Sequence, residues 1–167
     1  MHWTQNAKYI ALWNLFYQKT ALYLRPQLDV MNKKGEILII EDDEDDREYI
    51  EAVFSELSYE NERIYVNDAY AALEYVRQHD KNPFMIISDI NMPGMNGFEL
   101  RDIIFSDPEL NKKCIPYIFL STSDDEALVA KAFKLSVQGY FKKPNDYEAL
   151  KSVINQIMTY WITSCTP

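Results

Sequence analysis

The chain has 167 residues, of which 47% are hydrophobic, and it carries a formal net charge of -9 at pH 7. This length suits one domain with a full hydrophobic core plus a short extension. The acid excess argues against non-specific binding to nucleic acid, because a phosphate backbone requires a basic surface. The two cysteines, Cys114 and Cys165, lack the spacing of metal ligands and are typical of unpaired thiols in a reducing cytosol. A cytoplasmic protein with protein partners is therefore expected.

Residues 1–33 are predicted to form an N-terminal extension, because their composition differs from that of the rest of the chain. Asp29 is their single acid, whereas basic residues occur along their whole length. Residues 7–24 contain few helix breakers and predict a helix with one largely aromatic side. That side would hold Tyr9, Leu12, Trp13, Phe16, Tyr17 and Tyr23.

Three interpretations of this extension stay open. It could be a helix that docks on the domain or forms a homodimer, or a helix that lies on a membrane surface. It could also be a start-site artefact, with translation beginning at Met31. Lys8, Asn14 and Lys19 interrupt the apolar pattern too often for a membrane span. A signal peptide is not expected either, because no cleavage site of small residues follows an apolar core.

From residue 36 onward, short apolar runs alternate with helical patterns. The runs predict buried parallel strands at 36–40, 63–66, 85–88, 117–120 and 139–141. Helices are predicted at 44–58, 69–78, 98–105, from 124 onward and at 145–162, with a loop between Asp107-Pro108 and Pro116. Five βα units in series indicate the α/β class and a doubly wound, five-stranded parallel sheet. No second globular domain is expected after residue 164.

Polar residues of a particular kind follow four of the predicted strands. Glu41 and Asp42 come after the first strand, Asp89 after the third, Ser121 after the fourth and Lys143 after the fifth. In an open α/β sheet the ligand site lies outside the carboxyl ends of the strands, so these side chains are expected to converge on one pocket.

The predicted pocket suits magnesium and phosphoryl transfer. Magnesium prefers hard oxygen ligands, which Glu41, Asp42 and Asp89 supply. A carboxylate such as Asp89 can form an acyl phosphate, and the metal and Lys143 would offset the added charge. The acids at residues 43–46 are instead expected to be a solvated helix start. Ser121 could merely cap a helix, and Lys143 could extend to solvent unless the backbone at Pro144 aims it inward.

Taken together, residues 35–162 resemble the receiver domain of response regulators in two-component signalling. The matching features are the acidic pair Glu41-Asp42, the segment from Ser88 to Gly94 around Asp89, and the residues that correspond to the switch hydroxyl, the switch aromatic and the lysine of the family. Those three residues are Ser121, Tyr140 and Lys143, the last followed by Pro144. The pair is Glu-Asp rather than Asp-Asp, and the hydroxyl is Ser rather than the commoner Thr.

The resemblance implies a flavodoxin-like (βα)5 fold with strand order 2-1-3-4-5, a receiver domain over residues 34–164 and a tail at 165–167. A histidine kinase or histidine phosphotransfer protein would phosphorylate Asp89. Magnesium would be bound by Asp42, Asp89 and the backbone carbonyl of Asn91, with Glu41 acting through water. Asn91 and Ser123 would tune the reaction. Ser121 and Tyr140 would couple it to binding of a downstream protein.

This resemblance implies a stand-alone regulator rather than a dedicated enzyme. Residues 120–123 and the loop before the fourth strand also look like single-domain regulators paired with phytochrome-type kinases. Two alternatives stay open. One is a receiver that serves only as an unphosphorylated docking module. The other is a phosphatase-like hydrolase with Asp89 as nucleophile, although such enzymes carry Asp-x-Asp after the first strand, whereas here the motif follows the third and its second acid is replaced by Asn91.

Overall fold

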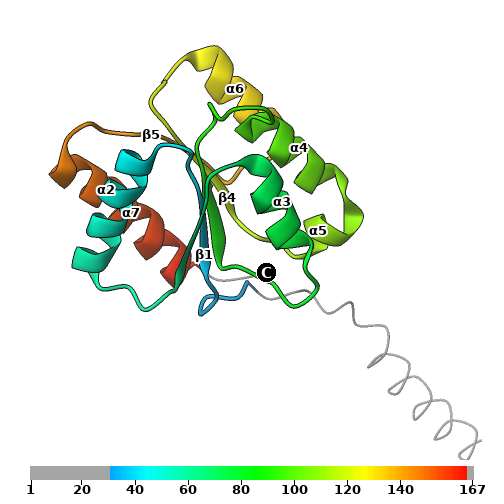
Figure 1. Ribbon diagram of the computed structural model, residues 1–167, viewed down its shortest axis with the longest axis horizontal. Coiled ribbons are helices and arrows are strands. Elements are labelled where there is room, and N and C mark those ends of the chain that lie inside the picture. The colour runs from blue at the N-terminus through cyan, green and yellow to red at the C-terminus, as the bar shows by residue number, and fades with distance from the viewer. Residues whose placement is uncertain (1–30, 165–167) are drawn as a thin grey trace, which may run out of the picture. The chain divides into compact units, whose positions relative to one another are not determined.

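The computed structural model describes residues 31–164, which form a parallel sheet covered by helices on both faces (Figure 1). The strands are β1 (Ile37–Ile40), β2 (Arg63–Val66), β3 (Met85–Ser88), β4 (Tyr117–Ser121) and β5 (Gly139–Lys142). All neighbouring strands are parallel and their order is β2-β1-β3-β4-β5. The predicted fold class and strand order are therefore confirmed. The helix predicted at 7–24 and the tail at 165–167 lie outside the described residues.

Two layers of helices enclose two separate cores. The helices are α2 (Glu44–Leu57), α3 (Ala69–Arg77), α4 (Gly97–Ser106), α5 (Pro108–Lys112), α6 (Glu126–Lys134) and α7 (Tyr147–Thr163). Residues of α2 and α7 pack with one face of the sheet, and residues of α3, α4, α5 and α6 pack with the other (Figure 1). Every residue of β1, β3 and β4 is buried. This explains why those strands read as continuous apolar runs rather than as alternating ones.

An acidic or amide side chain caps the N-terminus of each described helix. The cap side chain accepts hydrogen bonds from backbone N–H groups of the first turn, which have no partner inside the helix. The caps are Asp43, Asp68, Asn96, Asp107, Asp125 and Asp146. Part of the acid excess of this chain therefore has a structural role at helix starts.

The loop predicted between Asp107 and Pro116 is wrong in part, because it contains the short helix α5. The Asp107 side chain accepts hydrogen bonds from the N–H groups of Glu109 and Leu110, and Pro108 occupies the first turn. Proline suits that position, since its missing N–H would have no helical partner there. Leu110 is buried in the core on the α3 and α4 side. The Asp-Pro pair was therefore a helix start rather than a loop signal.

The first described residues contact the end of α7. Met31 packs against the core beneath α2 and α7. The Lys33 ammonium donates hydrogen bonds to the carbonyl oxygens of Ile162 at 2.8 Å and Ser164 at 2.5 Å. Asn61 in turn donates to the carbonyls of Lys33 and Gly35. Within residues 31–164, no helix combines the length and apolar character needed to cross a membrane.

Candidate functional site

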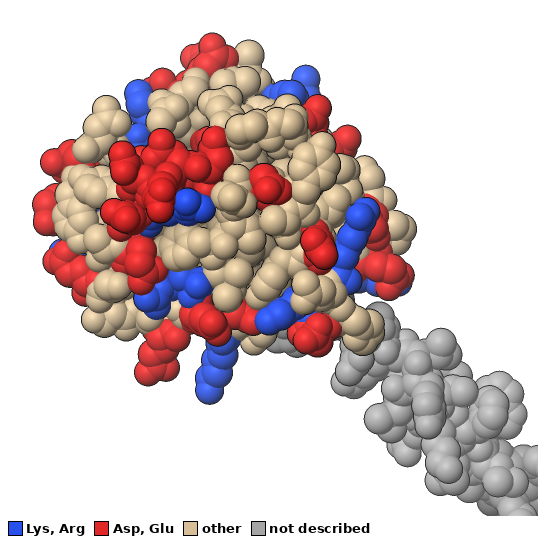
Figure 2. Space-filling view, viewed as in Figure 1, with Lys and Arg blue, Asp and Glu red and all other residues tan. Residues whose placement is uncertain are grey.

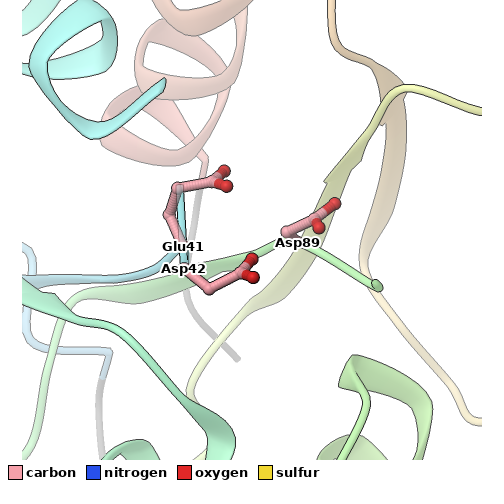
Figure 3. A group of neighbouring side chains, drawn as sticks. All are labelled: Glu41, Asp42 and Asp89. Atoms are coloured by element: carbon pink, nitrogen blue, oxygen red, sulfur yellow. The ribbon is translucent and has the colours of Figure 1, made fainter. Parts of the chain in front are cut away.

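The parallel register brings the acids after β1 and β3 together. Ile40 lies opposite Ser88, and the Asp89 N–H donates to the Ile40 carbonyl at 2.9 Å, so Glu41 and Asp89 follow neighbouring strand ends. Ligand oxygens of Glu41, Asp42 and Asp89 all lie within 4.8 Å of one another. Figure 3 shows these three side chains extending from the strand ends into the same space. The predicted acidic cluster is therefore present.

The three carboxyl groups differ in burial, and this sets their electrostatics. Glu41 is only 3% exposed, Asp89 is half-buried and Asp42 is exposed. Burial raises the pKa of Glu41 to about 7, although hydrogen bonding to Lys143 opposes the shift. Burial also raises the pKa of Asp89, while the backbone N–H groups of Ile90 and Asn91 and the charge of Lys143 act in the other direction. The cluster thus concentrates negative charge that a cation would stabilise.

Lys143 provides the one buried cation that the described residues place beside this cluster. Its backbone N–H donates to the Ser121 carbonyl at 2.7 Å, which fixes it at the strand ends. Its side chain is 7% exposed, and the ammonium lies 2.5 Å from a carboxylate oxygen of Glu41 and 2.5 Å from one of Asp46. Burial alone would lower the pKa of Lys143, but these two acceptors outweigh it and raise the pKa. Lys143 points inward rather than to solvent, and the peptide bond to Pro144 is trans.

Asp46 is a member of the site that the sequence did not reveal. It lies within a run of six consecutive acids from Glu41, and the run after Asp42 was expected to be a solvated helix start. That expectation holds for Asp43, which caps α2 by accepting from the Asp46 N–H at 3.0 Å. Asp46 stands one turn further on, where its side chain returns to the strand ends and meets Lys143.

The two expected switch residues are connected through Ser123. Ser121 is fully buried at the end of β4, and its hydroxyl oxygen accepts from the Ser123 N–H at 3.4 Å. The Tyr140 hydroxyl donates to the Ser123 carbonyl at 2.7 Å, and its ring packs edge-on against Phe119 at 6.2 Å. Lys142 does not join the site, because it forms an exposed ion pair with Asp124 at 2.7 Å.

The loop after β3 wraps closely around Asp89. The Asn91 N–H donates to the Asp89 carboxylate at 3.1 Å. A Cβ at Gly97 would approach the Asp89 backbone oxygen to 2.4 Å, so only glycine lets α4 begin this close to the strand end. The Asn91 residue itself is exposed.

These residues fit a hard divalent cation. Carboxylate oxygens are the ligands that magnesium prefers, and the exposed Asp42 leaves one side of the cluster open to water or a phosphoryl group. Figure 2 shows acidic side chains gathered over the start of α2, near these strand ends. The geometry thus defines an acid cluster around one potential nucleophile, with a lysine held beside it.

The fold and this site define a receiver domain. The chain belongs to the response regulator receiver domain family, whose sequence model matches residues 37–155. It is 27% identical to Response regulator Rcp1 of Synechocystis sp. over 83% of this chain and 96% of that protein. It is 28% identical to Chemotaxis protein CheY-3 of Vibrio cholerae over 77% of this chain and 95% of that protein.

Solved structures give the same assignment. The phosphorylated cyanobacterial phytochrome response regulator RcpA matches with a TM-score of 0.72 and 29% identity, over 80% of this chain and 98% of that one. The Mn(2+)-bound form of response regulator Rcp1 matches with a TM-score of 0.70 and 28% identity, over 80% of this chain and 99% of that one. The predicted similarity to regulators of the phytochrome type is confirmed.

Proposed function

We propose that this chain is a stand-alone response regulator that accepts a phosphoryl group on Asp89 from a histidine kinase or a histidine phosphotransfer protein. One observation carries the proposal: Asp89 shares a cluster of carboxylates with Glu41 and Asp42, and a buried lysine lies beside them. A phosphorylated relative and a manganese-bound relative with the same fold support it.

The transfer itself needs little covalent chemistry from the protein. A carboxylate oxygen of Asp89 forms a bond to phosphorus, the bond between phosphorus and the donor imidazole nitrogen breaks, and that nitrogen keeps the electron pair and takes up a proton. The chain contributes position and charge. The Asn91 N–H orients the Asp89 carboxylate, and Lys143 offsets the negative charge that the phosphoryl group adds.

Magnesium is the proposed cofactor, held by Asp42, Asp89 and the backbone carbonyl of Asn91, with Glu41 acting through water. When bound, its charge offsets that of the phosphoryl oxygens. The exposure of Asp42 supports a direct role for this side chain. Glu41 is buried and already bonded to Lys143, which supports an indirect role.

The proposed output is a change in protein binding at the face formed by α6, β5 and α7. Phosphorylation would draw Ser121 toward the phosphoryl group, and the bond from Tyr140 to Ser123 would pass this movement to β5. Phe133 on α6 and Tyr160 on α7 are more than half exposed and offer apolar contacts to a partner. The proposal includes a cytoplasmic location and no dedicated enzymatic activity beyond loss of the protein's own phosphoryl group.

Incubation of the full chain with acetyl phosphate, with magnesium or with a chelator, tests the proposal by intact mass. One added phosphoryl group in magnesium, and none with the chelator, is expected. No addition in either condition would favour an unphosphorylated docking module. Steady turnover of phosphate esters would favour a phosphatase-like hydrolase.

A further inference from the structure

The Lys143 ammonium is divided between two carboxylates, neither of which is the proposed phosphoryl acceptor. It donates to Glu41 Oε2 and to Asp46 Oδ2, each at 2.5 Å. The Glu41 side chain is 5% exposed, whereas that of Asp46 is 42% exposed. Asp46 therefore closes the solvent side of an otherwise buried ion pair.

Asp89 is not a hydrogen-bonded partner of this ammonium among the described residues. Its carboxylate accepts from the Asn91 N–H, and Lys143 acts on it only through space. An ammonium has three N–H donors, and two of those on Lys143 are already committed. A phosphoryl group on Asp89 could use the remaining donor, but the bonds to Glu41 and Asp46 hold the ammonium toward their side of the site.

The fold itself makes little use of the Asp46 carboxylate. The backbone N–H of Asp46 serves the N-cap of α2, and this bond does not depend on the side chain. Glu44 and Asp45 already provide acids in the first helical turn. The bond to Lys143 is therefore the specific contact of this side chain.

We propose that Asp46 is a positioning residue that holds the Lys143 ammonium on the α2 side of the site and so competes with the phosphoryl group on Asp89 for this cation. The inference rests on the proposed function. Because Asp46 is partly exposed, water screens its charge. The competition should therefore slow phosphorylation of Asp89 by only about three- to tenfold.

The test compares Asp46→Asn with Asp45→Asn in the full chain. Both variants remove one acid from the same turn of α2, but Asp45 is exposed and is not bonded to Lys143 in the structure. With acetyl phosphate and magnesium, Asp46→Asn should label about three- to tenfold faster than wild type. Asp45→Asn should stay close to wild type, and Asp46→Glu should restore most of the slow rate.

A second readout needs neither metal nor phosphoryl group. In metal-free protein, the ammonium protons of Lys143 should be observable by NMR, because two carboxylates hold them away from water. In Asp46→Asn these protons should exchange with water several-fold faster, which a purely structural role of Asp46 would not produce. If Asp46→Asn fails to fold, Asp46→Ser provides a second neutral side chain at this position.

The outcomes separate the inference from the proposed function. If wild type takes up no phosphoryl group, the proposed function fails, whatever the NMR result. If wild type is labelled but Asp46→Asn and Asp45→Asn have equal rates, the competition is refuted and Asp46 is only one charge among several. Unchanged exchange of the Lys143 protons in Asp46→Asn would refute it as well.

Discussion

The Lys143 ammonium and the Glu41 carboxylate form an ion pair of 2.5 Å, and both side chains are less than a tenth exposed. Removing one partner of such a pair leaves an uncompensated charge in the interior, which is strongly unfavourable unless the remaining group changes its protonation. Glu41 can do so near neutral pH, because burial raises its pKa to about 7. The charge state of this buried pair therefore depends on pH near neutrality.

Stability of the metal-free protein should depend on pH through Glu41. Since the pKa of Glu41 is about 7 in the folded state and 4.5 in the unfolded chain, the folded protein keeps a proton at pH values where the unfolded chain releases it. The stabilisation that this proton gives the folded state is fully present below the pKa of Glu41 in the unfolded chain, and it is lost as pH rises through 7. Relative to Glu41→Gln, wild type should lose about 2 kcal/mol of unfolding free energy between about pH 5 and pH 8.

Urea unfolding of wild type and Glu41→Gln in chelator, over a series of pH values, measures this difference. A difference between the two proteins that does not vary with pH would mean that Glu41 stays ionised in the folded state.

Magnesium affinity should depend more on Asp42 than on Glu41. Asp42 is exposed at the open side of the cluster, whereas Glu41 is buried against Lys143. Asp42→Asn removes a proposed direct ligand, and its loss of affinity should exceed that of Glu41→Gln by about tenfold. Isothermal titration of magnesium into both variants gives the order, and equal losses would contradict the division between direct and water-mediated ligands.

Arg101 should contribute to stability by joining α4 to the end of α6. It is 5% exposed and donates to the carbonyls of Leu135 at 2.9 Å and Ser136 at 2.8 Å, with its guanidinium over the Tyr117 ring. Arg101→Lys keeps the charge but cannot reproduce the two-point contact, so it should cost about 1–3 kcal/mol of unfolding free energy. The same change at the exposed Arg77 is the control in denaturant unfolding, and similar small effects at both positions would refute the role.

Residues 1–30 should be dispensable for folding and phosphorylation. The proposed site residues lie between Glu41 and Lys143, and residues 31–164 supply the two described cores. A chain that begins at Met31 should unfold cooperatively and label normally. A chain that begins at Glu36 should be less stable, because it loses the bonds from Lys33 to the end of α7. Loss of labelling in the chain that begins at Met31 would show that the removed residues belong to the domain.

The strand ends could be predicted from sequence because a buried parallel strand leaves a simple pattern. Ile37–Ile40 is apolar over its whole length and residues 85–87 are apolar as well, and the polar side chains that follow these runs mark the edge of the sheet. Parallel pairing then brings those side chains together, whatever lies between them in sequence. The cluster of Glu41, Asp42 and Asp89 follows from this rule alone.

Contacts that depend on a distant partner could not be predicted in this way. Asp46 resembles its acidic neighbours in sequence, and its partner Lys143 lies 97 residues away. Arg101 would be expected on a solvated helix face, yet it is buried where α6 ends. The helix α5 was missed for a different reason, since its Asp107-Pro108 start is a local signal that also occurs in turns.

The most direct test of the central claim is intact mass of Asp89→Asn after incubation with acetyl phosphate and magnesium. The substitution is nearly isosteric and relieves crowding of like charges beside Glu41 and Asp42, so the variant should fold at least as stably as wild type. Wild type and the control Asp80→Asn, at an exposed loop position, should each gain one phosphoryl group, and Asp89→Asn should gain none. Full labelling of Asp89→Asn would contradict the account.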